Sequence, residues 1–148
     1  VIADSKDAKA EFIKADKSMD GQFSKSYGYV IFPNVGKGGL GVGGAAGNGA
    51  VYEQGKLVGT AKLSQVSIGL QAGGQAYREV IFFENKESMD RFKDNRVEFS
   101  AQVSAVAAAS GASANAKYVE GVMVFTMQKG GLMYEASVGG QKFKFEKN

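Results

Sequence analysis

Residues 36–49 read GKGGLGVGGAAGNG, and this glycine-rich stretch decides what kind of fold the chain can adopt. The chain has 21 glycines in 148 residues, and further glycine runs lie at 67–75 and 130–140. Glycine weakens a strand because it has no side chain to pack and loses the most backbone freedom on folding. So many glycines indicate either sharp bends or places where another backbone or a ligand comes very close.

The first two glycine runs have the alternation of strands. In residues 39–44, glycines alternate with Leu40 and Val42, which predicts a strand with one smooth face. Residues 66–73 alternate in the same way. Asn48-Gly49 is a strong hairpin signal, so we expect the chain to turn there and return over 50–53.

Other segments are rich in β-branched and aromatic residues or alternate with period two. A strand is expected to end at Pro33, and Gln54-Gly55-Lys56 predicts a turn. The run EVIFF is apolar throughout and predicts a strand buried on both faces, while residues 108–117 predict a loop. The predicted strands are 27–32, 57–63, 79–83, 99–107, 121–127, 132–138 and 141–145, and the alanines of 99–107 also allow a helix there.

Two helices are predicted. Residues 4–20 carry a narrow apolar stripe at helical spacing, with Asp4 or Ser5 as the cap and Gly21 as the stop. The stripe consists of Ala8, Phe12, Ala15, Met19 and Phe23. A short helix near 86–94 is capped by Asn85, with Met89 and Phe92 facing inward.

Together these elements predict an α+β fold dominated by antiparallel β-structure, either a barrel-like sheet or a sandwich. The length suits one domain over 1–148, with an N-terminal helix at 1–22 and a glycine-rich β core at 27–146.

Composition removes several function classes. The chain has no cysteine and no histidine, which excludes disulfides, thiol chemistry and the usual soft-metal sites. Its net charge of +3 is far below that of a dedicated nucleic-acid binder. No apolar run approaches the length that spans a bilayer. The chain begins at Val1 without an initiator Met, so we expect that any targeting segment was removed upstream.

Enzyme chemistry is not indicated. GVGGAA at 41–46 matches G-x-G-x-x-A, but Asn48-Gly49 would interrupt the helix that a dinucleotide fingerprint needs. The acids gather in the two predicted helices among lysines and arginines, as on solvated helix faces, or stand isolated, as Glu79 does. We therefore expect no enzyme, no cofactor and no metal site.

Basic residues are the candidate binding residues. Their spread is compatible with a diffuse surface for anionic lipid headgroups, and equally with ordinary surface lysines. Lys37 stands between glycines whose N–H groups could form an anion-binding nest. Further lysines follow late in the chain at positions 129, 142, 144 and 147. The candidates are Lys37, Lys56, Lys62 and Arg78 beside the glycine runs, and Lys6, Lys9, Lys14 and Lys17 in the N-terminal segment.

Several segments together resemble one family. YGYVIFPNVGKGG at 27–39 is similar to the opening motif of the SYLF lipid-binding domain, VSIGLQAGGQ at 66–75 to its central motif, and FTMQKGGL at 125–132 to its C-terminal segment. The form with Phe-Pro-Asn-Val is most similar to the bacterial branch, whose members are often secreted or lipoprotein-like. The motif glycines are Gly36, Gly38, Gly39, Gly41, Gly43, Gly69 and Gly73.

The resemblance implies binding to membrane lipids, which in eukaryotic relatives means phosphoinositides, with an amphipathic helix and actin-linked partners. For a bacterial member it implies anionic phospholipids of the envelope and a periplasmic or outer-membrane location. Either surface lysines or an apolar cavity for an acyl chain would carry the binding. The alternative is an envelope scaffold or protein-interaction module whose smooth strand faces pack against a partner or a second copy.

Overall fold

The computed structural model describes residues 1–36, 45–65, 76–100, 103–128 and 138–148. The predicted strands at 39–44 and 66–73, and nearly all of the one at 132–138, lie outside these ranges. The described elements are α1 (Ile2–Ala15), α2 (Met19–Lys25), β1 (Gly28–Gly36), β2 (Ala45–Glu53), β3 (Lys56–Gln65), β4 (Tyr77–Phe83), α3 (Lys86–Lys93), β5 (Ala105–Ala107), the 3₁₀ turn η1 (Ala112–Asn115), β6 (Val122–Gln128) and β7 (Lys142–Lys147).

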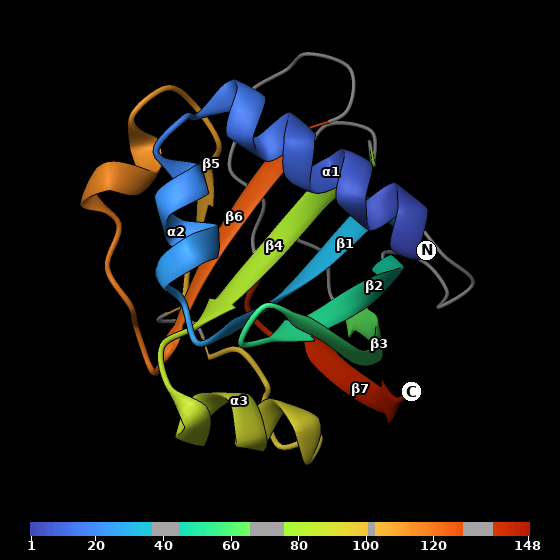
Figure 1. Cartoon of the computed structure of the whole chain (residues 1–148). Coiled ribbons are helices and arrows are strands. Elements are labelled where there is room, and N and C mark those ends of the chain that lie inside the picture. The colour runs from blue at the N-terminus through green and yellow to red at the C-terminus, as the bar shows by residue number, and fades with distance from the viewer. Residues whose placement is uncertain (37–44, 66–75, 101–102, 129–137) are drawn as a thin grey trace.

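The seven described strands form one sheet in the order β5-β6-β4-β1-β2-β3-β7. Every neighbouring pair is antiparallel except β5 and β6. The predicted α+β class with a mostly antiparallel sheet and an N-terminal helix is confirmed (Figure 1). The sheet is open and has two ends, rather than being divided into two packed sheets.

One segment connects the two edges of this sheet. Glu98 pairs with Lys142 of β7, and the Phe99 carbonyl accepts a backbone hydrogen bond of 2.8 Å from Gly140. A few residues later, Ala105–Ala107 pair with β6 at the other edge. Within the described part of the predicted strand at 99–107, only Ala105–Ala107 form a strand, and residues 99, 100, 103 and 104 do not. Residues 101–102 lie outside the described ranges.

The N-terminal helix differs from its prediction. Val1, rather than Asp4 or Ser5, is the N-cap, and α1 ends at Ala15. Asp16 is extended and buried, and its side chain accepts hydrogen bonds from beyond the helix, so the chain breaks and restarts as α2. Gly21 lies inside α2 rather than stopping a helix. The apolar stripe is confirmed at Ala8, Phe12, Met19 and Phe23, which are buried against the sheet.

The strand end predicted at Pro33 and the turn predicted at Asn48-Gly49 are also wrong. Pro33 does not end the strand, since β1 continues to Gly36. The register shifts around the proline in the pairing of β1 with β2 and in its pairing with β4. Asn48-Gly49 is not a turn, because both residues pair with β3 inside β2. The turn predicted at Gln54-Gly55 is confirmed, with φ of 52° and 80° at its two central residues, as a two-residue hairpin requires.

The remaining elements agree with their predictions. β4 is buried along both faces, and Asn85 caps α3 by accepting a 2.9 Å bond from the Ser88 N–H. Strands β6 and β7 lie where 121–127 and 141–145 were predicted to be extended.

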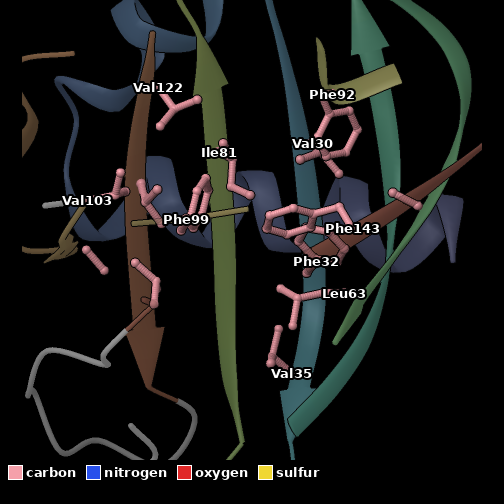
Figure 2. Close-up of a cluster of buried hydrophobic side chains, with 14 of the residues drawn as sticks. Val30, Phe32, Val35, Leu63, Ile81, Phe92, Phe99, Val103, Val122 and Phe143 are labelled. Atoms are coloured by element: carbon pink, nitrogen blue, oxygen red, sulfur yellow. The ribbon is translucent and has the colours of Figure 1, made fainter. Parts of the chain in front are cut away.

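The sheet carries a hydrophobic core on each face. On one face, α1 and α2 cover the strands (Figure 1), and Phe12, Met19 and Phe23 pack there against Tyr29 and Phe82. The other core, the inner core, includes residues of α3 and the side chains of Val97, Phe99 and Val103. Figure 2 shows the inner core, where Phe92, Phe99 and Phe143 meet side chains of β1, β4 and β6. This second face also holds the polar residues described below.

Close backbone approach explains four of the five glycines in the described strands, Gly28, Gly47, Gly49 and Gly59, whereas a Cβ on Gly36 would meet nothing closer than 3.7 Å. A Cβ on Gly49 would lie 2.6 Å from the Ile31 carbonyl oxygen and 2.8 Å from Cδ1 of Phe32. Gly28 meets Tyr52 O and Gly59 meets Glu146 O in the same way. Of the two explanations for strand glycines, close contact with neighbouring backbone therefore applies at these positions.

This contact predicts the result of a paired substitution. Gly49→Ala is expected to lower the free energy of unfolding by about 2 kcal/mol, because β1 must shift to admit the methyl group. Gly21→Ala is the matched control, since a Cβ there would have nothing within 4 Å and the residue is inside a helix. It is expected to raise stability by roughly 0.5–1 kcal/mol. Urea unfolding of both variants tests this, and equal effects would contradict the close-contact explanation.

Candidate functional site

Two lysines face each other on the β3–β7 pair. Lys62 of β3 lies directly opposite Lys144 of β7, and both are exposed. Lys142 is exposed two residues earlier on the same face of β7, while Glu146 follows two residues later. Among the described residues, neither Lys62 nor Lys144 takes part in an ion pair. We call Lys62, Lys142 and Lys144 the β3–β7 lysine surface.

The lysines of the N-terminal segment are placed differently. Lys6, Lys14 and Lys17 are exposed, but α1 also carries Asp4, Asp7 and Glu11 on its exposed surface. Lys9 is half-buried: its ammonium lies 5.1 Å from the centre of the Phe23 ring and 3.4 Å from the Tyr29 hydroxyl. Lys9 therefore helps to hold α1 on the sheet.

The other predicted site residues are not brought together. Lys56 is exposed at the β2–β3 hairpin, and Arg78 is half-buried on β4 opposite Met127. Lys37 lies outside the described residues, and so do all the motif glycines except Gly36, at the end of β1. The structure thus places Lys62 beside Lys142 and Lys144 from the C-terminal part of the chain, which were not among the candidate residues.

A cluster of polar side chains lies on the inner-core face of the sheet. It is at the end of the strands where Gln65 of β3, Tyr77 of β4 and Gln128 of β6 lie. Tyr77 pairs with Gln128 and Glu79 with Thr126 across β4 and β6. The amide nitrogen Nε2 of Gln141 lies 2.9 Å from Glu79 Oε1, 3.2 Å from the Tyr77 hydroxyl and 3.3 Å from Gln65 Oε1. Each member is at most 7 % exposed. We call this set the polar end cluster: Gln65, Tyr77, Glu79, Thr126, Gln128 and Gln141.

Burial dominates the electrostatics of this cluster. It raises the pKa of Glu79 to about 8, against which the Gln141 hydrogen bond acts only weakly, so the carboxyl is largely protonated at neutral pH. Burial also raises the pKa of Tyr77 far above its usual range. Four side chains of the cluster hold buried polar atoms that have no hydrogen-bond partner among the described residues: Glu79 Oε2, Thr126 Oγ1, Gln141 Oε1 and both amide atoms of Gln128.

Sequence reasoning did not find the polar end cluster, because it treated Glu79 as an isolated acid. A signal was present: Tyr77, Glu79, Ile81 and Phe83 alternate on one face of a strand that is otherwise buried on both sides. A carboxyl in such a strand must face a core. Which glutamines meet it depends on pairing between segments more than 60 residues apart.

Three surface pockets among the described residues border the inner core. One, of about 160 Å³, is lined by Arg91 and Arg96 together with Val97, Phe99 and Val103. Another, of about 190 Å³, is lined by valines of β5, β6 and their surroundings and by Lys117. Both are smaller than a usual ligand pocket. The third, of about 380 Å³, is lined by Arg96, Val97, Lys142 and Phe143.

Within the described ranges, no group of three or more acidic side chains is placed to hold a metal ion. No described helix is long and apolar enough to cross a bilayer.

Comparison with known proteins identifies the family. The family model Ysc84, described as "Las17-binding protein actin regulator", matches residues 64–148, a region that includes Lys142, Lys144 and the whole polar end cluster. Beta cell expansion factor A of Aeromonas veronii is 30% identical over 128 residues, which cover 85% of this chain and 48% of that protein. The chain thus spans about half the length of this curated relative. The chain belongs to the Ysc84 (SYLF) family, which is not a known enzyme family.

Proposed function

We propose that this domain binds anionic phospholipids at the surface of a bacterial envelope membrane, without catalysing a reaction, and that the β3–β7 lysine surface makes the contact. The observation that carries the proposal is the pairing of Lys62 with Lys144. Membership of the Ysc84 (SYLF) family supports a lipid-binding or actin-regulator type of domain.

The lysine pair is a costly arrangement for folding alone. Like charges directly opposite each other on neighbouring strands destabilise a sheet. Lys62 and Lys144 are exposed, and no described acid pairs with either ammonium group. An anionic headgroup layer would relieve this repulsion and supply the missing countercharge.

The helix α1 is a weaker candidate for this contact. Its apolar stripe faces the sheet, as the burial of Ala8 and Phe12 shows, and only Val1 and Ile2 at its start are exposed large apolar residues, so the helix has no broad apolar face to enter a membrane. Its exposed lysines alternate with acids, whereas an interfacial helix normally has a basic polar face and a free apolar face.

A matched pair of triple variants tests the proposal by liposome co-flotation. Lys62→Gln/Lys142→Gln/Lys144→Gln is expected to bind anionic vesicles at least tenfold more weakly than the unaltered chain, because each basic group near the membrane contributes to binding. Lys6→Gln/Lys14→Gln/Lys17→Gln removes the same charge from α1 and the following turn, and is expected to bind within about twofold of the unaltered chain. Binding should weaken between low and physiological salt.

Equal losses in the two triple variants would show that only net charge matters and would contradict the assigned surface. Loss only in the α1 variant would place the contact on the helix. Salt-insensitive binding, with lipid still attached after purification, would favour an acyl-chain cavity. Mass spectrometry of the extracted protein identifies that lipid.

We further propose a periplasmic or outer-membrane-associated location, on the resemblance to the bacterial branch of the family. A second candidate function is a protein-interaction module, which the description of the family as Las17-binding actin regulators supports. Light scattering across concentrations and affinity capture from envelope extracts test it. A strict monomer without a reproducible partner would count against it.

A further inference from the structure

A surface pocket lies where the segment after α3 runs along the outer edge of β7. Its volume of about 380 Å³ is within the range of small-molecule pockets. Glu98 pairs with Lys142 at this edge, and the Asn95 side chain accepts a 2.7 Å hydrogen bond from the Phe145 N–H. The segment is thus fixed to β7 at two points. We call this the edge pocket, and its lining residues are Asn95, Arg96, Val97, Glu98, Lys142 and Phe143.

Charged groups of both signs line the edge pocket. Glu98 and Lys142 lie directly opposite each other, so their Cβ atoms are about 5 Å apart and both side chains are on one face. Neither takes part in an ion pair with any described residue. The Arg96 guanidinium lies 3.5 Å from the Asp94 carboxylate, and its side chain remains 68% exposed. The pocket therefore offers two cations and one carboxylate to a ligand.

The other lining residues suit the neutral parts of such a ligand. Asn95 uses its Oδ1 to hold the Phe145 N–H, so its Nδ2 remains as a donor that no described residue uses. Val97 is half-buried and Phe143 is buried, and both pack in the inner core. Their side chains are held in place by the core, and they add apolar surface against which methylene groups can lie.

A phosphate and a primary ammonium joined by two carbons match this arrangement. Lysine and arginine both bind phosphate oxygens, and Arg96 is able to donate two parallel hydrogen bonds to one phosphate. The Glu98 carboxylate would repel a second anionic group, but it accepts hydrogen bonds from an ammonium. The two-carbon link holds the two charges about as far apart as the facing side chains of Glu98 and Lys142.

We propose that the edge pocket binds one phosphoethanolamine headgroup of a membrane lipid, with the phosphate at Arg96 and Lys142 and the ammonium at Glu98. The inference rests on the proposed function, because Lys142 belongs both to this pocket and to the β3–β7 lysine surface, which would bring the pocket to the membrane. The lysine surface then attracts anionic lipids by charge, while the edge pocket selects one zwitterionic lipid beside them.

Flotation with matched vesicles tests this selection. Phosphatidylglycerol is mixed with either phosphatidylethanolamine or phosphatidylcholine, at the same anionic fraction and the same salt. The unaltered chain is expected to bind the ethanolamine vesicles about threefold more tightly, because the trimethylated choline nitrogen has no hydrogen to donate to Glu98. Equal affinity for the two vesicles would overturn the inference and leave the proposed function standing.

Glu98→Gln removes the carboxylate, and its affinities for the two vesicles are expected to be equal. Glu87→Gln is the matched control, since Glu87 is exposed on α3 and the substitution changes the net charge by the same amount. It should keep the threefold ratio. The ratio is compared, because both variants gain positive charge and bind all anionic vesicles more tightly. A preference that persists in Glu98→Gln would assign it to bilayer packing and overturn the inference.

A soluble headgroup tests the pocket without a membrane. Glycerophosphoethanolamine at millimolar concentration is expected to shift the NMR amide signals of residues 95–98 and 142–143, and glycerophosphocholine should shift them much less. Absence of these shifts would overturn the inference. A chain that floats with neither vesicle but shows the shifts would contradict the proposed function and retain the headgroup pocket, so the two failures are distinguishable.

Discussion

Glu79→Gln is expected to become more stable relative to the unaltered chain as the pH rises. Between pH 5 and pH 8.5, the difference in free energy of unfolding should move by about 4 kcal/mol in favour of the variant. Urea unfolding at several pH values and constant ionic strength measures it.

The direction follows from the pKa of the carboxyl. It is 4.5 for an ordinary glutamate and rises to about 8 in the fold, because Glu79 is fully buried. Between these values the unfolded chain has released the proton while the folded chain still holds it. The unaltered protein therefore loses about 1.4 kcal/mol of stability per pH unit over this window, and the loss stops above pH 8. Glutamine has no proton to release, so the variant escapes this loss.

Glu98→Gln is the matched control, since Glu98 is exposed at the start of the segment that joins the sheet edges. Its pH profile is expected to run parallel to that of the unaltered chain. Parallel profiles for Glu79→Gln as well would show that burial does not raise the pKa of Glu79 in the fold.

Asp16→Ala is expected to cost about 3 kcal/mol at pH 7, because four donors would lose their acceptor. The buried carboxylate accepts bonds from the backbone N–H groups of Ser18, Gly111 and Ser113, and from the Ser18 hydroxyl. It thereby fastens the α1–α2 break to η1, which lies 95 residues or more along the chain. Asp16→Asn keeps one oxygen and should lose less.

The pH dependence of this effect has the opposite sign to that of Glu79. Desolvation alone would raise the pKa of Asp16, but the donors from Ser18, Ser113 and Gly111 outweigh it and leave the pKa below the ordinary 3.8. The stabilisation is therefore complete above pH 3.8 and disappears as the pH falls below it, so the variant and the unaltered chain should converge in acid. Asp7→Ala, on the exposed surface of α1, should change stability by no more than about 0.5 kcal/mol. A similar loss in both variants would contradict the role of Asp16.

The sequence predicted correctly those elements whose signals lie within a few adjacent residues. The Asn85 cap, the Gln54-Gly55 turn and the apolar run of β4 each depend on a few adjacent residues, and each is confirmed. Signals that compete with long-range pairing were misleading. Asn48-Gly49 has the sequence of a hairpin turn, but both residues pair with β3, and β1 pairs with the residues on either side of them, Gly47 and Ala50.

The candidate site shows the same division. The sequence indicated lysines as binding residues, but not which of them meet, since Lys62 and Lys144 are 82 positions apart and only the pairing of β3 with β7 joins them. The polar end cluster was not predicted at all, because the apolar strand around Glu79 indicates that the carboxyl is buried, but only the assembled sheet shows which side chains it meets.

Composition and spacing by themselves determined the α+β class, the family resemblance, the apolar stripe of the N-terminal segment and the absence of cysteine and histidine chemistry. Those properties follow from residue types and from periods of two and 3.6, which the chain carries in any conformation. The tertiary structure alone decided that the strand glycines serve close backbone contact, that Asp16 breaks the helix, and that Glu79 is buried beside three glutamines. Each depends on distances between residues far apart in the chain, and such distances exist only after the sheet has formed.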